Sequence, residues 1–355
     1  MKKLTHITRI SLLLAVFFAL DKGLGIFRQV FIARRFVLPD QDVFNVANNF
    51  PDLISALIAG GALTIAFLPV LSSLLTKEGK SAAWDLFSRV ANLAFLATGG
   101  LALIVAAFAW PLVSHVIAPG LAADQQRVVV ELMRLDLIAT VIFSISGLIM
   151  AGLQANQHFL LPATAPLLYN LGQIFGAVIL APQTGLHFGP ITLPAFGMGV
   201  YGLVYGVILG AVLHLLIQIP GLVKYQFKWV PRIGFNHPAV KEALSLLGPR
   251  IITMLFIQFV FVTRDAIASF SGQGAISSLT YGWMILQVPE TLIGTAIATA
   301  LLPTISEQVA RQDWQSFRQT IERAVQALLA ITLPITLILG FGLQPLVVLA
   351  FGPKF

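Results

Sequence analysis

Long apolar stretches separated by short polar connections are the dominant pattern of this 355-residue sequence. Crossing the hydrocarbon core of a bilayer takes about 20 helical residues, and each stretch reaches that length. Backbone groups inside a bilayer must be hydrogen-bonded within the protein, so each stretch is expected to be an α-helix. The sequence therefore predicts an all-α polytopic membrane protein with about nine transmembrane helices, over residues 8–36, 42–75, 86–117, 128–153, 161–180, 198–223, 243–270, 275–305 and 321–351.

Composition agrees with this pattern and excludes several functional classes. Charged residues make up only 10% of the chain and hydrophobic residues 57%, whereas a soluble domain carries about 25% charged residues. The chain has no cysteine, which excludes disulfides and thiolate metal sites. Its basic residues are scattered at the ends of spans rather than gathered in a patch, so nucleic acid is not expected as a partner. We expect membrane lipids around the chain and neither a metal ion nor a cofactor within it.

The N-terminal residues and the basic connections predict the orientation. MKKLTHITRI precedes an apolar run as in a signal peptide, but no small-residue cleavage pattern follows, so we interpret this run as an uncleaved first span. With the N-terminus in the cytoplasm, the cytoplasmic connections hold more Lys and Arg than the outer ones, as the positive-inside rule requires. The longest basic connection, 224–241, mixes Lys with Phe and Trp. That mixture is typical of a segment at a membrane surface that faces anionic lipid.

Charged residues lie inside the first predicted span. A charge within a span costs roughly a few kcal/mol or more, so it marks a binding or transport site by default. Asp21, Gly25 and Arg28 are spaced i, i+4, i+7 and share one helix face, and Lys22 follows Asp21. Gly23 and Gly25 place a flexible point beside these charges. We therefore predict substrate-binding roles for Lys22 and Arg28, and a hinge or gate at Asp21, Gly23 and Gly25.

A polar stripe runs along the second predicted span. Its members recur at three- and four-residue spacing: Asn45, Asn48, Asn49, Asp52 and Ser55. Such a stripe is costly against lipid, so we expect it to face a cavity or a partner helix. Hydrogen bonding between helices without any binding role is the alternative.

An internal repeat links the second and eighth predicted spans. FPDLI and AFLPVLSSL occur between Phe50 and Leu74, while VPETLI and ALLPTISEQ occur between Val288 and Gln308. This recurrence predicts two parallel six-span lobes with a substrate site between them. The expected domains are a six-helix lobe at 1–223, a cytoplasmic linker at 224–241, and the first three helices of a second lobe at 242–355. Arg264 in the seventh span would then face the same cavity. By this count the chain is C-terminally truncated; a complete nine-span protein is the alternative.

Several motifs resemble one family in their order along the chain. They are LGIFRQVFIARRF, DVFNVANNFPDLISALIAGGALTIAFLPVLSSLL, LPATAPLLYNLGQI and VPETLIGTAIATALLPTIS, and they are similar to the MurJ (MviN) lipid II flippases of the multidrug/oligosaccharidyl-lipid/polysaccharide exporter superfamily. The resemblance implies a fourteen-span fold and lipid-linked peptidoglycan transport, with roles in peptidoglycan synthesis, cell wall biogenesis and cell shape. It also implies that the cationic residues of the first span, which bind the substrate's pyrophosphate and sugar, are Lys22 and Arg28. The acid at the start of the second span is Asp42.

Two departures from the family pattern make the expected cavity less cationic. The arginine pair of the second span falls on Ser55 and Ala56, and the Asp-Arg of the eighth span falls on Trp283 and Met284. Arg264 stands at a position that is not usually charged in the family, so it is expected to compensate in part.

We weigh several functions against these residues. The first is a transporter that flips a polyprenyl-pyrophosphate-linked sugar, above all lipid II, across the bacterial cytoplasmic membrane by alternating access. Buried cations bind a diphosphate well where water is excluded, and the predicted substrate-binding set is Lys22, Arg28, Asp42, Asn49, Asp52 and Arg264. The cell-wall synthesis machinery is a candidate partner.

The alternatives are another lipid-linked oligosaccharide exporter, a cation or drug antiporter of the same fold, and an inactive pseudo-flippase. An antiporter would use buried carboxylates such as Asp21, Asp42 and Asp52. A membrane enzyme is disfavoured, because it needs clustered acids or a metal site at a membrane face, and neither occurs in the sequence.

Overall fold

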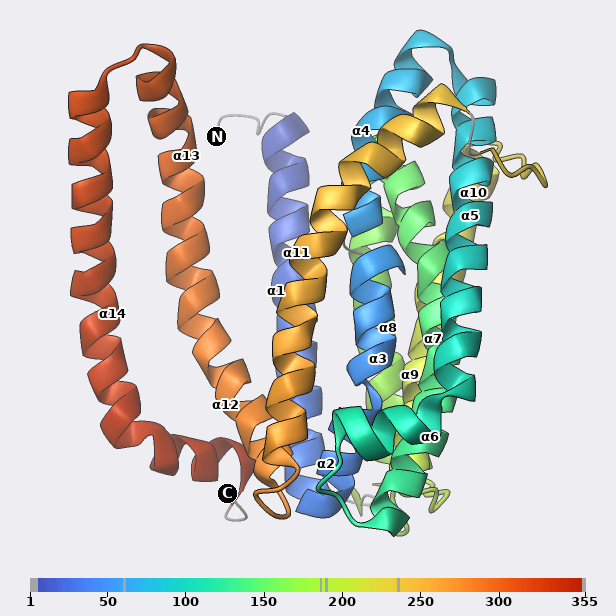
Figure 1. Cartoon of the computed structure of the whole chain (residues 1–355), viewed down its shortest axis with the longest axis vertical. Coiled ribbons are helices and arrows are strands. Elements are labelled where there is room, and N and C mark those ends of the chain that lie inside the picture. The colour runs from blue at the N-terminus through green and yellow to red at the C-terminus, as the bar shows by residue number, and fades with distance from the viewer. Residues whose placement is uncertain (1–5, 60–61, 186, 189–190, 235–236, 353–355) are drawn as a thin grey trace. The chain divides into compact units, whose positions relative to one another are not determined.

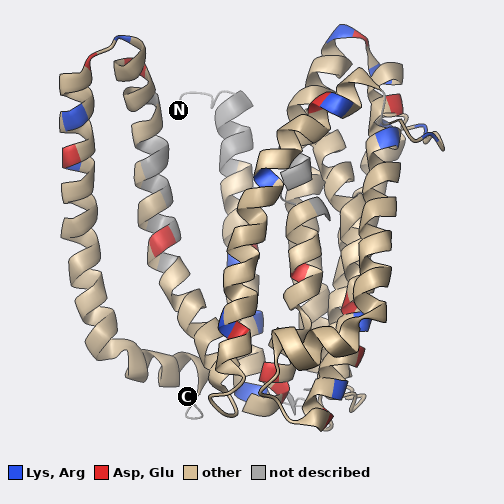
Figure 2. Cartoon of the chain, viewed as in Figure 1, with Lys and Arg blue, Asp and Glu red and all other residues tan. Residues whose placement is uncertain are grey.

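The computed structural model describes residues 6–59, 62–185, 187–188, 191–234 and 237–352. The described chain is almost entirely helical (Figure 1), which confirms the predicted all-α class. A small antiparallel pair of two-residue strands, β1 (His187–Phe188) and β2 (Ile191–Thr192), lies between two of the helices. Figure 2 shows long helical stretches without a charged residue, with most charges near helix ends.

Helices follow the predicted apolar stretches. The first stretch is one helix, and the next ones are divided: α1 (His6–Arg35), α2 (Leu38–Ala47), α3 (Asn49–Ile54), η1 (Ser55–Ala59), α4 (Ala62–Lys77), α5 (Lys80–Ala107), α6 (Ala109–Leu112) and η2 (Val113–Ile117). The middle of the chain forms α7 (Ala123–Ala155), α8 (Leu160–Phe175), η3 (Gly176–Leu180), α9 (Val200–Leu216), α10 (Ile219–Lys224) and α11 (Pro238–Ala268). The remainder forms α12 (Ala275–Pro289), η4 (Glu290–Thr295), α13 (Ala296–Ala310) and α14 (Trp314–Phe351).

Six helical segments of the described chain are long and apolar enough to cross a membrane. They are Lys80–Ala107, Ala123–Ala155, Leu160–Leu180, Val200–Lys224, Pro238–Ala268 and Trp314–Phe351. Charged residues interrupt the apolar run of α1, and short helices divide the second and eighth predicted spans. The structure thus supports a multi-span membrane protein, while the count of nine spans stays a prediction.

The division of the second and eighth predicted spans follows the same local pattern. In each, a wider π-helical stretch lies next to a Pro–acid pair: η1 begins at Ser55, shortly after Pro51-Asp52, and η4 begins at Glu290 itself. Proline lacks the N–H that an α-helix needs, and π turns commonly accompany such interruptions. The sequence repeat is therefore matched by a repeat in local helix geometry.

The chain forms two compact units, 1–273 and 274–355. By this grouping α11 belongs to the first unit. The predicted domain boundary at 224–241 was placed by the sequence repeat rather than by compactness, and it stays a prediction. In the first unit α7 packs against α4, α5 and α9, and α8 packs against α1 and α9. In the second unit α13 packs against α14, and the rings of Tyr281 and Phe351 stack with centroids 4.7 Å apart.

Small residues allow α8 and α9 to approach closely. A Cβ atom on Gly172 of α8 would lie closer to the Cα of Gly210 on α9 than real Cβ contacts allow. Membrane helices associate largely through van der Waals packing, which such glycines bring about. The α8–α9 contact therefore fixes the position of α8, which carries Asn170 towards α1.

Candidate functional site

Asn170 on α8 joins two charged residues of α1. Its Nδ2 donates to Asp21 Oδ1 at 2.8 Å, and its Oδ1 accepts from Arg28 Nη1 at 3.1 Å. Gly25 lies between these two charges, and a Cβ there would already be 3.8 Å from Asn170 Oδ1. The predicted common face of Asp21, Gly25 and Arg28 is therefore confirmed, and Asn170 links this face to α8.

Two more carboxylates extend this group from other helices. Asp52 on α3 lies within electrostatic range of Arg28, and Asp136 on α7 lies within range of Asp52. Thr140, one turn after Asp136, donates to the carbonyl of Pro51 at 3.4 Å, which holds α7 against α3. We call Asp21, Arg28, Asp52, Asp136 and Asn170 the Arg28 cluster. It brings one cation and three carboxylates together from four helices.

Asp136 is the most enclosed acid of this cluster. It is 4% exposed, and its Oδ1 has no hydrogen-bond partner among the described residues. Asp52, in contrast, is exposed. The sequence reasoning missed Asp136, although the signal was available: it is an acid inside the predicted span 128–153, farther from the start of the span than Glu131 and Arg134, and the cost of such a charge marks it as functional by default.

A second polar cluster forms around Asp265 near the end of α11. Asn49 Nδ2 donates to Asp265 Oδ2 at 3.1 Å, and the Arg264 guanidinium forms an ion pair with Oδ1 at 2.7 Å. Asp42 on α2 lies within electrostatic range of Asp265, and both acids are 1% exposed. We call Asp42, Asn49, Arg264 and Asp265 the Asp265 cluster. It connects α2 and α3 to α11.

The structure thus divides six of the predicted site residues between two clusters, while Lys22, Gly23 and Gly25 belong to neither. Arg28, Asp52 and Asp21 lie in the first, whereas Asp42, Asn49 and Arg264 lie in the second. Lys22 is exposed, and its Nζ lies 5.3 Å from the centre of the Phe18 ring; no hydrogen bond or ion pair in the described chain joins it to the Arg28 cluster. Gly23 faces open space within the uninterrupted helix α1, so the proposed hinge stays a prediction.

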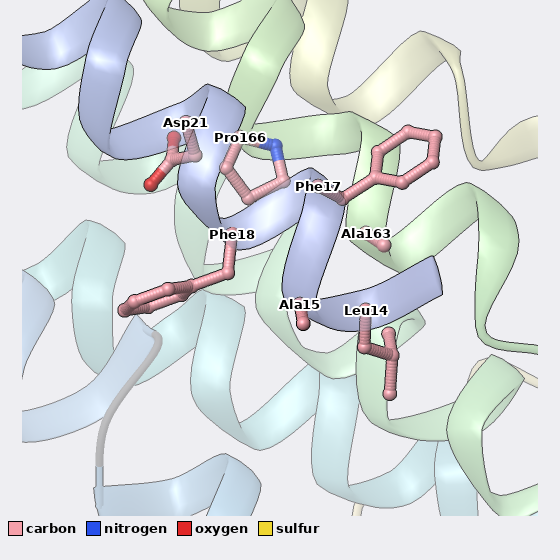
Figure 3. A pocket seen from close by; sticks show the side chains of 7 residues that line it. All are labelled: Leu14, Ala15, Phe17, Phe18, Asp21, Ala163 and Pro166. Carbon is pink, nitrogen blue, oxygen red and sulfur yellow. The ribbon is translucent and has the colours of Figure 1, made fainter. Parts of the chain in front are cut away.

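An apolar pocket lies between α1 and α8, beside Asp21. Its volume is about 410 Å³, and Figure 3 shows the seven residues that line it: Leu14, Ala15, Phe17, Phe18, Asp21, Ala163 and Pro166. Asp21 is its one charged member. The pocket has the chemistry to hold part of an apolar chain next to a carboxylate.

The two clusters can perform different chemistry. The guanidinium of Arg28 matches phosphate oxygens in shape and charge, while carboxylates attract protons or cations. In the described chain no group of three or more His, Asp or Glu residues is placed to hold a metal ion. The Asp265 cluster is built from complementary charges, and breaking a buried ion pair is strongly destabilising. Its chemistry therefore suits a structural connection between helices.

Comparison with known proteins shows what the chain is similar to. A family model described as "Lipid II flippase MurJ" matches residues 36–354. The "Lipid II flippase MurJ" of Burkholderia cenocepacia is 31% identical, with 98% of this chain and 66% of that protein aligned. The "Probable lipid II flippase MurJ" of Rhizobium tropici is 31% identical over 83% of this chain and 54% of that protein. The chain therefore spans less than two thirds of the length of these relatives.

Solved structures show the same fold. One titled "Lipid II flippase MurJ, inward closed conformation" superposes with a TM-score of 0.72 at 21% identity, over 96% of this chain and 67% of that one. An inward-facing multidrug resistance transporter of the MATE family gives a TM-score of 0.71 at 14% identity, over 93% of this chain and 72% of that one. At these identities the similarity concerns the fold alone.

Proposed function

Because this chain belongs to the MurJ family of lipid II flippases, we propose that it carries lipid II, a polyprenyl-pyrophosphate-linked sugar precursor, across the bacterial cytoplasmic membrane. The observation that carries this proposal is Arg28, a cation held inside the first unit by Asn170 and faced by carboxylates of neighbouring helices. A cation kept away from bulk water binds a diphosphate strongly. The family's name supplies the substrate, and Arg28 supplies a group that can bind it.

We propose nine membrane spans, with the N-terminus in the cytoplasm. The helical segments follow each other along the nine predicted apolar stretches, and the Lys and Arg bias favours this orientation. The Pro–acid pairs Pro51-Asp52 and Pro289-Glu290, each with a π-helical stretch beside it, support two lobes related by a parallel repeat. The first lobe would end at residue 223, the basic linker would cover 224–241, and the second lobe would begin at 242.

The Arg28 cluster would bind the diphosphate of the substrate. When no substrate is bound, its carboxylates would neutralise the charge of Arg28. With substrate bound, Arg28 would turn from its carboxylate neighbours towards phosphate oxygens, while Asn170 keeps its position through Asp21. Without substrate, Asp52 would balance the charge of Arg28. Lys22 would meet the sugar or phosphate part from the exposed side of α1, and Gly23 and Gly25 would let α1 bend.

The Asp265 cluster would close one side of the transporter. Asn49 and Asp42 come from the first lobe, whereas Arg264 and Asp265 come from the first helix of the proposed second lobe. Separating α11 from α3 would break the Asn49–Asp265 bond, so these residues would open and close as the lobes rock. Substrate-induced opening would need to compensate for this lost bond.

A cation antiporter of the same fold is the second candidate. Three carboxylates, Asp21, Asp52 and Asp136, accompany one arginine in the Arg28 cluster. An excess of acid is what a transporter of protons or cations requires. This candidate predicts that the carboxylates are essential and Arg28 is dispensable.

Complementation distinguishes these functions. A strain depleted of its lipid II flippase would receive this chain, or a chimaera that adds the remaining third of the Burkholderia cenocepacia relative. Arg28→Ala would be compared with Arg35→Ala, which removes an exposed arginine from the end of the same helix. A direct assay of lipid II movement in vesicles would accompany growth.

Rescue that Arg28→Ala abolishes and Arg35→Ala leaves intact would support lipid II flipping through the Arg28 cluster. Rescue by the Arg28→Ala variant would support lipid II flipping but would rule out the Arg28 cluster as the binding site. Absence of rescue by both membrane-inserted versions would overturn lipid II as substrate. Drug or cation export that depends on Asp52 and Asp136 would then favour the antiporter.

A further inference from the structure

A basic pocket lies at one end of the first unit, away from both polar clusters. It encloses about 410 Å³ between the first turns of α5 and the chain that follows α10. We call it the rim pocket, and its lining residues are Lys80, Ser81, Trp84, Asp85, Gln226, Lys228, Val230 and Arg232. Three candidate membrane spans begin or end around it: Lys80 begins α5, Lys224 ends α10, and Pro238 begins α11. The rim pocket therefore lies where the bilayer meets water.

Specific contacts hold the wall of this pocket in place. Trp84 Nε1 donates to the carbonyl of Tyr225 at 3.1 Å, and the Val230 N–H donates to Ser88 Oγ at 3.2 Å. Asn92 Nδ2 donates to the carbonyls of Val230 and Arg232, each at 3.0 Å. The connection after α10 is thus attached to α5 along several residues. The rim pocket is consequently a formed cavity.

The rim pocket has an excess of positive charge. Lys80, Lys228 and Arg232 face one acid, Asp85. Asp85 already accepts from Arg89 at 2.7 Å, and its contact with Arg232 is longer, at 3.8 Å. In the described chain no ion pair involves Lys80 or Lys228. The pocket therefore offers uncompensated cations to an anionic ligand.

Large apolar side chains stand exposed beside these cations. Val223 is 73% exposed, Trp229 is 61% exposed and Ile233 is 54% exposed, and all three belong to or flank the same connection. Trp is enriched where a membrane protein meets the headgroup region. Cations together with neighbouring apolar side chains match a ligand with a phosphate and acyl chains.

We propose that the rim pocket binds the phosphate headgroup of an anionic phospholipid from the adjacent leaflet. Lys80, Lys228 and Arg232 contact the phosphate, and Trp229 and Ile233 lie against the acyl chains. Asp85 keeps Arg232 in position and competes with the ligand for it. This assignment is independent of the transported substrate, since the rim pocket shares no residue with either polar cluster.

Native mass spectrometry of the full chain in detergent tests this proposal. The probes are phosphatidylglycerol, zwitterionic phosphatidylcholine and inorganic phosphate. The pocket variant is Lys80→Gln/Lys228→Gln/Arg232→Gln. The matched control, Arg311→Gln/Arg318→Gln/Arg323→Gln, removes the same charge from exposed arginines of the second unit.

The expected result is selective binding of phosphatidylglycerol, weakened about 100-fold in the pocket variant, because each of the three cations near an anionic membrane surface contributes about fivefold. The control should change binding only a few-fold. Equal weakening in both variants would overturn the site, and equal binding of phosphatidylcholine would overturn the charge argument. Inorganic phosphate that binds as tightly as phosphatidylglycerol would assign a free anion in place of a lipid.

Asp85→Asn is a second variant, which tests the same pocket through an expected gain in lipid affinity. Removing the competing acid should tighten phosphatidylglycerol binding several-fold while leaving the three cations in place. Unchanged or weaker binding in a folded Asp85→Asn protein would contradict the proposal, even if the triple variant fails to fold.

Discussion

The helices α7 and α14 are equally suited to a membrane and differ completely in packing. Both are long and apolar, but 61% of the most apolar part of α7 is buried within the protein, compared with 0% in α14. The difference arises from neighbours: α7 is surrounded by α4, α5, α8 and α9, while α14 contacts chiefly α13. Hydropathy therefore decides where a helix resides, and side-chain fit decides what it packs against.

The largest expected difference between these regions comes from removing a phenyl ring. Phe87 is 2% exposed and packs edge-on against Trp84 and Phe227, whereas Phe341 on α14 is 90% exposed. Phe87→Ala should lower the free energy of unfolding by about 3–5 kcal/mol through the cavity it leaves. Phe341→Ala should change it little. Denaturant titrations in mixed micelles measure the free energy of unfolding of both variants. Equal losses of stability would refute the proposed difference in packing between the two helical regions.

A smaller effect is expected from adding bulk at a helix contact. Gly206→Val would force α9 away from α8 and η3, because a Cβ at Gly206 already meets the carbonyl oxygen of Gly172 on α8 and the backbone of Gly176 in η3. Overpacking of this kind costs about 1–3 kcal/mol. A Cβ added at Gly340 on α14 would meet no atom within 4 Å, so Gly340→Val is the matched control. Thermal unfolding in detergent should separate the two variants, and a neutral Gly206→Val would show that the α8–α9 contact is looser than described.

The connection after α7 should respond to mild acid. Burial, and the nearby charge of Lys224, lower the pKa of His158 from its ordinary value of 6.5. As pH falls below 6.5 the unfolded chain therefore takes up a proton before the folded chain does, and stability falls until folded His158 is protonated. His158→Gln should remove that part of the pH dependence. Unfolding curves at several pH values provide the measurement. If the original chain and His158→Gln show the same dependence of stability on pH, His158 does not contribute to it.

The smallest effect is expected at the start of α14. Asp313 caps this helix by accepting from the Ser316 N–H at 3.0 Å, and hydrogen bonds from Ser316 hold the pKa of Asp313 below its ordinary value of 3.8. The stabilisation is present above pH 3.8 and is lost as pH falls through the lower, folded value. Hydrogen exchange of the Ser316 amide should accelerate in Asp313→Ala at neutral pH. Exchange that is unchanged by this substitution would show that the cap does not hold the helix end.

The sequence predicted part of the Arg28 cluster and very little of the Asp265 cluster. The spacing of Asp21, Gly25 and Arg28 was enough to place them on one face, because helical periodicity is a local property. The pairing of Asn49 with Asp265 was beyond that reasoning, since the two residues are 216 positions apart. Asp136 was overlooked because it follows Glu131 and Arg134, two charged residues that the start of a span at the membrane interface explains.

The sequence by itself determined that the chain is helical and membrane-embedded, and it carries the motifs that resemble the family. Those properties follow from local composition and period, which do not depend on distant residues. The tertiary structure decided which distant polar groups meet: it brought Asn170 and Asp52 to Arg28, and it brought Asn49 and Asp42 to Asp265. Charges separated by many residues interact only once helix packing brings them within a few ångströms, because electrostatic energy depends on distance in space.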